Sequence, residues 1–226
     1  SSIQEVTEEI IIKICKYLKK NYKFKNLCLA GGVALNCVAN GKILEKKLFE
    51  NVYIQPAAGD AGGALGAALT FWYQEMNNKR VTNIDQMRGS YLGPNYNQDE
   101  IKLELDNFKL EYEVLDELSL YNITANKISE GNVVGWFQDS MEFGPRALGN
   151  RSILADPRNG NMQKKLNLKI KFRESFRPFA PSILKEKAKI YFNINHESPY
   201  MLFVASINDT KLNKLSEEDK NLKGFD

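Results

Sequence analysis

The sequence predicts an α/β protein, and three apolar runs carry this prediction. Two short runs, 26–30 and 52–54, each end in a glycine-containing turn that leads into a segment of helical character. A third run, 131–138, follows a helical segment and has the composition of a buried strand. Strands that alternate with helices in this way are typical of α/β folds.

The composition is that of a globular protein without a membrane-spanning segment. The 226 residues are 43% hydrophobic and 26% charged, which suffices for one large or two modest domains. No apolar run approaches the length of about 20 residues that a bilayer-spanning helix needs, so we expect no membrane partner. The net charge of +3 is too small to indicate nucleic acid binding by itself.

The first residues and the cysteines favour a cytoplasmic protein. Glu5, Glu8 and Glu9 lie where a secretory signal would carry positive charge. The number of cysteines is odd, and their spacing is not that of metal ligands. They are Cys15, Cys28 and Cys37. We therefore expect buried free thiols in a reducing compartment.

Residues 3–20 have the periodicity of an amphipathic helix. Apolar side chains recur every three or four positions, and lysines occupy the other face. The apolar positions are Ile3, Val6, Ile10, Ile14 and Tyr17/Leu18. The sequence therefore predicts a helix before the first strand.

The first predicted strand, 26–30, leads into Gly31-Gly32 and a helical segment, VALNCVANGKILEKKLF. Glycines let a ligand approach the backbone closely, and the start of a helix offers unpaired N–H groups. This is the local form of a nucleotide-binding turn. Because a turn in any α/β protein can carry glycines for packing alone, both interpretations stay open at this point.

A second unit repeats the pattern, with a strand over 52–54, a turn over 56–60 and a helix over 61–76. Each glycine in a helix costs about 1 kcal/mol relative to alanine, so glycines there indicate close packing or a nearby ligand. The glycines are Gly62, Gly63 and Gly66. For Asp60 there are two interpretations: its carboxylate caps the helix, or it binds a metal ion or a nucleotide.

Residues 77–93 are polar and irregular, and we predict a linker there with a domain boundary near Arg88. Beyond the linker we predict helices over 97–107, 116–130 and 184–192, and strands over 110–114, 131–138, 152–155 and 179–184. The tail after Ile207 is charged and poor in large apolar residues, so we expect it to be mobile.

Arginines gather in the segment 136–182, which holds five of the seven in the chain. Nine basic residues in this segment stand against four acidic ones, a local excess of +5. A solvated basic face is the plain interpretation of such a cluster. However, these arginines alternate with Gly, Pro and aromatic residues, and the planar fork of arginine suits bidentate capture of phosphate or carboxylate. The pattern favours a rigid anion pocket.

Four motifs of the chain belong together: GGVALN, NVYIQPAAGDAGGALGAAL, EFGPRALGNRSILADPR and RESFRPFAPS. In combination they resemble the ATP-dependent O-carbamoyltransferases of the NodU/CmcH type, over the stretch from about Leu27 to Val204. The resemblance implies an actin/hexokinase-like (ASKHA) ATPase domain followed by a YrdC-like α/β domain. It assigns residues 1–88 to the C-terminal part of the first domain. Residues 89–226 would form most of the second.

The resemblance also implies an activity and its partners. The family forms carbamoyl-adenylate from carbamoyl phosphate and ATP, and then transfers the carbamoyl group to a hydroxyl of a small metabolite. Its ATPase-like domain holds a divalent metal, iron or magnesium, with the help of paired histidines. This chain has a single histidine, His196, which lies in no ligand pattern, so we expect a middle fragment of a longer enzyme.

Site residues follow from the motifs that match. The family's fixed cations correspond to Arg146, Arg151, Lys171 and Arg173, which we expect to stabilise charge that shifts during catalysis. Substrate binding is expected from Arg177, Ser182 and Glu142, and Glu142 is expected to contribute by orienting arginines rather than by acting as a base. The nucleotide-contacting loop corresponds to Gly31, Gly32 and Asn36. The metal-ligand aspartate corresponds to Asp60.

Further expectations concern the chain on its own. Because YrdC-like domains also serve tRNA modification, a nucleotide- or RNA-binding module is the alternative function, and an inert fragment is a third. We expect Asp60 to bind no metal tightly without its histidine partners. The side chains of Arg146, Arg151 and Arg173 should converge on one phosphate site. An apolar face left uncovered in an incomplete lobe favours a homo-oligomer.

Overall fold

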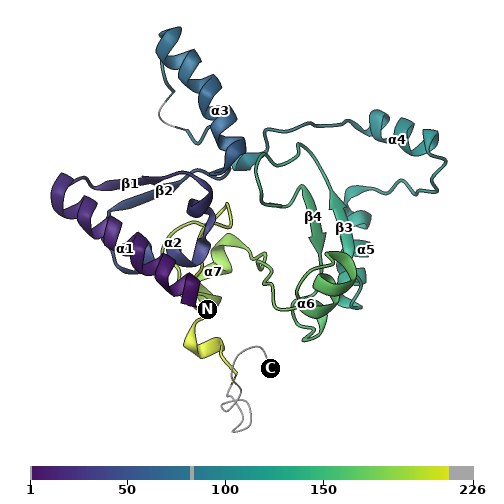
Figure 1. Ribbon diagram of the computed structural model, residues 1–226. Coiled ribbons are helices and arrows are strands. Elements are labelled where there is room, and N and C mark those ends of the chain that lie inside the picture. Colours follow the sequence, from purple (N-terminus) through teal and green to yellow (C-terminus); the bar gives the residue numbers. More distant parts are fainter. Residues whose placement is uncertain (1, 82–83, 214–226) are drawn as a thin grey trace. The chain divides into compact units, whose positions relative to one another are not determined.

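A computed structural model describes residues 2–81 and 84–213 and divides the chain into two compact units (Figure 1). Unit 1 contains the described residues of Ser1–Asn95, Ser140–Asn150 and His196–Ala205. Unit 2 contains those of Tyr96–Asp139, Arg151–Asn195 and Ser206–Asp226. The chain therefore passes repeatedly from one unit to the other. Our predicted domain boundary near Arg88 stays a prediction.

Unit 1 has two strand–turn–helix repeats after an N-terminal helix, as the sequence predicts. Its elements are α1 (Ser2–Tyr22), β1 (Asn26–Leu29), a 3₁₀ turn (Gly32–Leu35), α2 (Cys37–Glu45), β2 (Asn51–Ile54) and α3 (Asp60–Thr70). A π turn, Phe71–Glu75, continues α3. The α/β class is confirmed, whereas the assignment to ASKHA and YrdC-like domains stays a prediction.

β1 and β2 pair in parallel, with Asn26 opposite Asn51 and Leu29 opposite Ile54. Parallel pairing brings the carboxyl ends of both strands to the same edge, where the two glycine-containing turns begin. Figure 1 shows α1 running alongside this strand pair. The arrangement therefore places the predicted nucleotide loop and the predicted metal ligand on one side of unit 1.

The core of unit 1 is built around the two strands. One apolar cluster joins Ala34, Ile54, Ala58 and Leu202, so a residue from the C-terminal part of the chain completes it. The other cluster joins Cys15, Leu27 and Ile43, with Ile11, Ile12 and Leu18 of α1 packed against it. Apolar side chains brought together in this way supply most of the driving force for folding.

The buried face of α1 differs from the stripe that the periodicity marks. Cys15 and Glu8 are the residues of α1 that are buried. Glu8 is paired with Lys42 of α2, and its Oε1 accepts a hydrogen bond from Gln4 Nε2 at 2.7 Å. Because Lys42 neutralises its charge and Gln4 donates a hydrogen bond to it, a carboxylate can lie on the core side of the helix.

The cysteines correct one expectation. All three are free thiols, but Cys15 alone is buried, while Cys28 is exposed and Cys37 is half-buried. Burial raises the pKa of the Cys15 thiol. Cys28 is exposed because it lies in the middle of a four-residue strand that alternates its side chains between two faces, and only one face is covered.

The described residues of unit 2 form an antiparallel strand pair and several helices. Its elements are α4 (Gln98–Asn107), α5 (Glu117–Ser129), β3 (Val134–Phe137), β4 (Arg151–Leu154), α6 (Met162–Lys165) and α7 (Ala188–Tyr191). In the β3–β4 pair, Val134 lies opposite Leu154 and Phe137 opposite Arg151. The helices and strands predicted for 97–107, 116–130, 131–138 and 152–155 are therefore confirmed to within a few residues.

Two predicted strands are wrong. Both segments, 110–114 and 179–184, are described, and neither forms a strand there. In the first, Leu110, Tyr112 and Val114 are all exposed, so their apolar alternation meets no covering layer. A strand also needs a neighbour for its N–H and C=O groups, and Pro181 in the second segment has no N–H to offer.

The remaining predictions for this region are settled in part. The predicted helix 184–192 is shorter, a 3₁₀ turn over Lys185–Lys187 followed by α7. Most of the tail that we expected to be mobile, 214–226, lies outside the described residues. In the part of the chain that the structure describes, no helix is long and apolar enough to cross a bilayer.

Candidate functional site

The turns that follow β1 and β2 form a cradle at the carboxyl end of the strand pair. The backbone N–H of Gly31 donates to the carbonyl of Ala58 at 2.7 Å, which ties the two turns together. Gln55 also steadies the second turn, because its Oε1 accepts a hydrogen bond from the N–H of Ala57 at 2.9 Å. In open α/β sheets, ligands characteristically bind at this edge.

A cavity of about 330 Å³ lies in this cradle. Its walls come from both turns and from the first turn of α3: Ala30, Gly31, Gly32, Gln55, Ala58, Gly59, Asp60, Gly62 and Gly63. The structure therefore brings together Gly31 and Gly32, from the predicted nucleotide loop, with Asp60, the predicted metal ligand. The whole of α2 and β2 separates these residues in the sequence.

The glycines of the cradle have two distinct roles. Gly31 has a φ of 97°, a conformation that side chains rarely adopt. A Cβ at Gly62 would lie 2.1 Å from the carbonyl oxygen of Ala57, so close packing requires glycine there. At Gly32 and Gly63, by contrast, an added Cβ would have no atom within 4 Å other than those of its chain neighbours and its own helix backbone. Packing does not explain these two glycines, and both line the cavity.

Asp60 is the first residue of α3 and is exposed. The N-cap is Gly59, which makes no side-chain cap, so the capping interpretation of Asp60 is wrong. Within the described residues, no group of three or more His, Cys, Asp or Glu side chains is placed to hold a metal ion. Asp60 thus offers one carboxylate to the cavity.

Asn36, the third predicted nucleotide contact, is used by the fold. Its Oδ1 accepts a hydrogen bond from the N–H of Ala39 at 3.1 Å and so caps α2. Its Nδ2 donates to Oε1 of Gln4 at 2.9 Å, which links α2 to α1. Asn36 does not belong to the residues that line the cavity.

Residues 140–150 of the arginine-rich segment belong to unit 1, and Glu142 holds this loop closed. Glu142 is buried, and its Oε1 accepts hydrogen bonds from the N–H groups of Leu148 and Asn150 at 2.7 and 2.8 Å. Asn150 in turn donates from Nδ2 to the carbonyl of Ser140 at 2.7 Å. The loop 140–150 is therefore fixed by its own side chains.

This loop is seated on the cradle through Gly144 and Arg146. Nη2 of Arg146 donates to the carbonyl of Leu35 at 3.0 Å, just after the Gly31-Gly32 turn. A Cβ at Gly144 would lie 3.1 Å from Cβ of Ala57 in the second turn. Nε of Arg146 is buried and has no hydrogen-bond partner among the described residues. Arg146 therefore retains a donor that a ligand or a water molecule can use.

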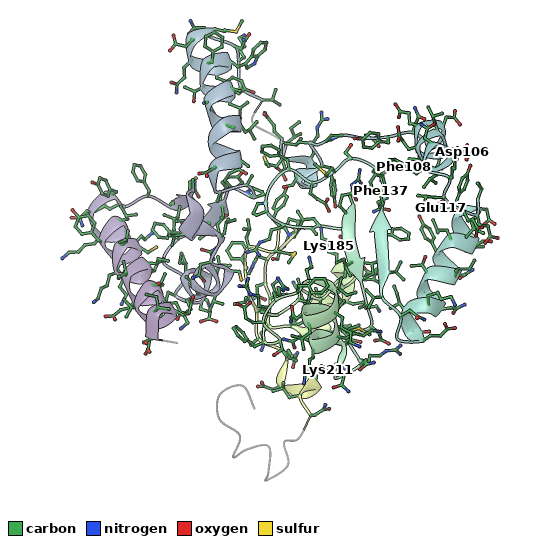
Figure 2. All side chains as sticks on the ribbon, turned by 45° about the vertical axis from the view of Figure 1, so that its right-hand side comes forward. Asp106, Phe108, Glu117, Phe137, Lys185 and Lys211 are labelled. Atoms are coloured by element: carbon green, nitrogen blue, oxygen red, sulfur yellow. The ribbon has the colours of Figure 1, made fainter. Side chains whose placement is uncertain are left out.

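Arg151 and its neighbours belong to unit 2. The Arg151 guanidinium lies 3.4 Å from the ring centroid of Phe137, the β3 residue labelled in Figure 2. Nη1 donates to the carbonyl of Gln138 at 2.6 Å, and Nη2 donates to that of Asp139 at 3.0 Å. Stacking and carbonyl contacts hold the guanidinium in one orientation.

The second half of the arginine-rich segment is organised by Asn167, which is fully buried. Its Nδ2 donates to the carbonyls of Ser175 and Arg177 at 3.0 and 2.8 Å, and its Oδ1 accepts from Nε of Arg173 at 2.7 Å. The Arg173 guanidinium also lies 4.9 Å from the ring centroid of Phe179. Asn167 was not among the residues that the sequence singled out.

The other predicted site residues of unit 2 differ in their contacts and in their exposure. Arg177 donates from Nε to Oε2 of Glu174 at 2.8 Å. Backbone hydrogen bonding and this arginine lower the pKa of the Glu174 carboxyl, so it stays ionised. Lys171 and Ser182 are exposed. Because Arg146 lies in unit 1 and Arg151 and Arg173 in unit 2, the convergence of the three on one phosphate site stays a prediction.

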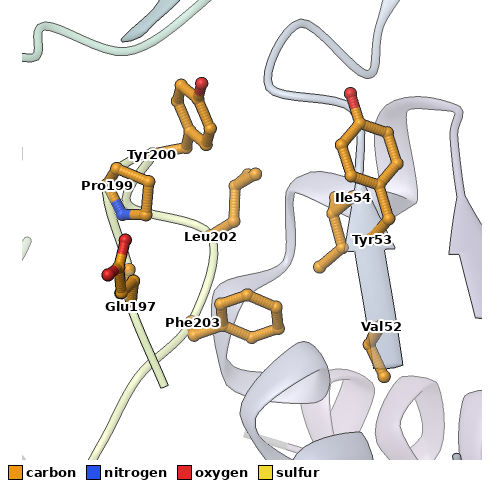
Figure 3. A pocket seen from close by; sticks show the side chains of 9 residues that line it. Val52, Tyr53, Ile54, Glu197, Pro199, Tyr200, Leu202 and Phe203 are labelled. Atoms are coloured by element: carbon orange, nitrogen blue, oxygen red, sulfur yellow. The ribbon is translucent and has the colours of Figure 1, made fainter. Parts of the chain in front are cut away.

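A second, smaller cavity of about 150 Å³ lies in unit 1 between β2 and the segment 196–205 (Figure 3). Figure 3 shows Leu202 pointing from that segment toward Ile54 of β2. The Tyr200 hydroxyl donates to Asp85 and accepts from the N–H of Gly89 at 3.3 Å. Burial, and then Asp85, raise the pKa of Tyr200 to about 12. This tyrosine ties segment 196–205 to the predicted linker.

Two family models match the chain. The model described as Carbamoyltransferase N-terminus matches residues 1–69. The model described as Carbamoyltransferase C-terminus matches residues 125–219. The first match includes the cradle, and the second includes both halves of the arginine-rich segment.

Individual relatives are similar along most of this chain. An uncharacterized protein of Synechocystis sp. is 51% identical over 100% of the chain and 37% of its own length. Nodulation protein NolO of Bradyrhizobium diazoefficiens is 41% identical over 95% of the chain and 39% of its own length. 3'-Hydroxymethylcephem-O-carbamoyltransferase of Streptomyces clavuligerus is 31% identical over 81% of the chain and 33% of its own length. The chain thus spans about two fifths of the length of these relatives, or less.

Proposed function

The chain belongs to the carbamoyltransferase family, and from that premise we propose that it is part of an ATP-dependent O-carbamoyltransferase. The complete enzyme would form carbamoyl-adenylate from carbamoyl phosphate and ATP. It would then pass the carbamoyl group to a hydroxyl of a small metabolite. The observation that carries this proposal is the cradle, where two glycine turns and Asp60 line one cavity.

The cradle suits a nucleotide phosphate group. Gly32 and Gly63 leave open space where side chains would stand, so a ligand can reach the backbone. The first turn of α3 borders the same cavity, and the amino end of a helix favours negative charge. We therefore assign the nucleotide to Gly31 and Gly32, with Asn36 supporting the turn from α2.

The arginines suit the carbamoyl phosphate step. Carbamoyl phosphate is a dianion, and adenylate formation moves further charge onto the departing pyrophosphate, so fixed cations stabilise the transition state. We assign this role to Arg146, Arg151, Lys171 and Arg173. Arg177 and Ser182 would bind the substrate. Glu142 would act by holding the loop of Arg146 in place, as its backbone contacts support.

The proposed chemistry balances in two steps. In the first step, water hydrolyses carbamoyl phosphate to carbamate and inorganic phosphate. A carbamate oxygen then bonds to the α-phosphorus of ATP, and pyrophosphate leaves. In the second step the acceptor oxygen bonds to the carbamoyl carbon. The bond from that carbon to the adenylate oxygen then breaks, AMP leaves with the electron pair, and the hydroxyl proton passes to solvent.

A divalent metal, iron or magnesium, belongs to the proposal for the complete enzyme. Asp60 supplies one oxygen ligand from this chain, and a specific site needs several. Within the described residues, no group of three or more His, Cys, Asp or Glu side chains is placed to hold an ion. We therefore derive no step of the reaction from the metal.

The names of the relatives bear on the acceptor. One of them is named as a carbamoyltransferase that acts on 3'-hydroxymethylcephem, a compound with a hydroxyl group. This supports a small hydroxylated acceptor for the present protein as well. The relatives' names give no support to the alternative of tRNA modification.

Calorimetric titration of the chain with ATP, and separately with carbamoyl phosphate, tests the proposal. We expect saturable binding of each ligand, and little pyrophosphate release when both are mixed, because the chain spans about two fifths of its relatives. If neither ligand binds at millimolar concentration, the proposal fails. Transfer RNA binding that persists at physiological salt would favour the alternative function instead.

A further inference from the structure

The outer face of α1 carries a continuous stripe of exposed apolar side chains. The stripe consists of Ile3, Val6, Ile10, Ile14 and Tyr17, whose exposed fractions lie between 49% and 76%. Their spacing of three or four residues aligns them along one side of the helix. Single exposed apolar residues are common, but a stripe along a whole helix is typical of an interaction surface.

Unit 1 does not use this stripe for its own core. The residues of α1 that pack against the core are Cys15, Ile11, Ile12 and Leu18. Glu8, on the core side, is occupied by its pair with Lys42. The helix is therefore apolar on two faces, one of which is already covered by the chain itself.

Charges along one flank of the stripe are sorted by sign. The first half of the helix carries the acidic residues Glu5 and Glu9, whereas the second half carries Lys13, Lys16 and Lys20. At about 100° per residue, all five lie next to the stripe on the same side. In an antiparallel two-fold pair this flank faces the same flank of the second helix, so each acidic half lies beside a basic half. In a parallel two-fold pair, this flank would face the opposite flank of the second helix, so the acidic and basic halves would not lie beside each other.

We propose that the stripe binds a second copy of this chain as an antiparallel pair of α1 helices. A two-fold axis near Ile10 places Ile3 opposite Tyr17 of the other copy and Val6 opposite Ile14. In the same register Glu9 lies near Lys13 of the other copy, and Glu5 lies near Lys16. Apolar contact and charge therefore agree on one orientation, which also gives a closed two-fold interface.

The interface is small. One helix face per copy is less than the area of about 800 Å² per partner in a standard interface, so the dimer forms in proportion to concentration. Sedimentation velocity over a wide range of protein concentrations measures this. We expect a monomer–dimer equilibrium for the wild type, and a monomer at the same concentrations for Ile10→Glu.

A matched variant controls for a general effect of charge on an exposed apolar position. Leu103 on α4 is 61% exposed, so Leu103→Glu makes the same kind of change on another helix. We expect this variant to dimerise like the wild type, with circular dichroism showing all three proteins folded. A monomeric wild type, or a dimer that survives Ile10→Glu, would overturn the proposal.

The orientation has its own test. Ile3→Cys and Tyr17→Cys are prepared as separate variants, mixed and oxidised, and the cross-linked peptides are identified by mass spectrometry. Antiparallel pairing gives disulfides between residue 3 of one variant and residue 17 of the other. Cross-links of residue 3 to residue 3 would contradict it. A chain that stays monomeric and instead binds a polypeptide with the remaining N-terminal region of its relatives would assign the stripe to that partner and overturn the proposal.

Discussion

Arg146 donates from Nη2 to the backbone carbonyl of Leu35, 3.0 Å away, and so fixes the arginine-rich loop against the turn that follows β1. Its Nε stays buried, without a hydrogen-bond partner among the described residues. A buried donor of this kind is costly unless something accepts from it. The arrangement is therefore suited to an anionic ligand.

Replacing Arg146 by lysine tests this role. Lysine keeps the charge but loses the fork, so we expect affinity for carbamoyl phosphate, measured by calorimetry, to fall about tenfold, which corresponds to roughly 1.4 kcal/mol. Arg80→Lys is the matched control, because Arg80 stacks on Tyr73 outside this segment. Unchanged affinity in Arg146→Lys would return the segment to a solvated basic face.

Alanine variants of two glycines in α3 distinguish an effect on ATP binding from an effect on helix stability. In both Gly63→Ala and Gly66→Ala, the new methyl group meets no atom within 4 Å apart from its chain neighbours and the backbone of its own helix. We expect each change to stabilise the helix by about 0.5–1 kcal/mol. Gly63 lines the cradle cavity and Gly66 does not, so weaker ATP binding is expected for Gly63→Ala alone. Equal ATP affinities in the two variants would argue against the cradle as the nucleotide site.

The Glu8–Lys42 pair makes stability depend on acid pH. Hydrogen bonding to Lys42, and then to Gln4, lowers the pKa of Glu8 below its ordinary value of 4.5. A carboxyl with a lowered pKa contributes stability above its unfolded pKa, and that contribution is lost as pH falls through the folded pKa. The melting temperature of Glu8→Gln should therefore be lower at neutral pH and fall less steeply below about pH 4.5.

Glu9→Gln is the control for that measurement. Glu9 pairs with Lys13 on the exposed side of the same helix, and an exposed pair of this kind contributes little. Thermal melts at low protein concentration keep self-association out of the comparison. Identical pH profiles for wild type and Glu8→Gln would show that the pair does not stabilise the contact of α1 with α2.

Asn167 is expected to be the residue of unit 2 most sensitive to truncation. Asn167→Ala removes two donors to backbone carbonyls and the acceptor for Arg173, all in a fully buried position. The carbonyl of Ser175 and Nε of Arg173 then lose this hydrogen bond beside a fully buried position, whereas the carbonyl of Arg177 keeps Nε2 of Gln163 as a donor at 3.1 Å. We expect the free energy of unfolding to fall by about 2–3 kcal/mol in urea titrations.

Asn161→Ala is the control for the truncation of Asn167. Asn161 lies directly before α6 in the same segment, its side chain is exposed, and it makes no capping hydrogen bond to the helix. We expect its truncation to change the free energy of unfolding by less than about 0.5 kcal/mol. Equal losses of stability in the two variants would show that the Asn167 contacts do not organise this part of unit 2.

Metal content tests the expectation for Asp60. One carboxylate provides too few ligands for a specific transition-metal site. After dialysis, we expect elemental analysis to find well below one equivalent of iron or zinc per chain. One tightly held equivalent that disappears in Asp60→Asn would show that this chain completes the site without further residues.

Local patterns in the sequence were enough to predict the two strand–turn–helix units of unit 1. β1 and β2 are short apolar runs that lead into glycine-containing turns, and a segment of helical character follows each turn. The cradle follows from these units, because parallel strands bring their carboxyl ends to one edge. This is why the turn with Gly31 and Gly32 and the turn with Asp60 lie next to each other.

Features that depend on distant contacts could not be predicted. The alternation of Leu110, Tyr112 and Val114 is that of a strand, but only a neighbouring strand can satisfy its backbone. The importance of Asn167 comes from carbonyls eight and ten residues away in a loop without periodicity. In α1, the periodicity of the sequence indicated an apolar stripe, but it could not show that a different face of the helix packs against the core.

The contact of Asn40 with Leu202 has a consequence for biosynthesis. Nδ2 of Asn40 donates to the carbonyl of Leu202 at 3.0 Å, across a separation of 162 residues. At about 5–20 residues per second, a ribosome needs roughly 8–30 s to travel from one to the other. During that time the β1–β2 pair is outside the ribosome without the segment that completes its core. The nascent chain thus exposes apolar surface to chaperones until the segment around Leu202 has left the ribosome.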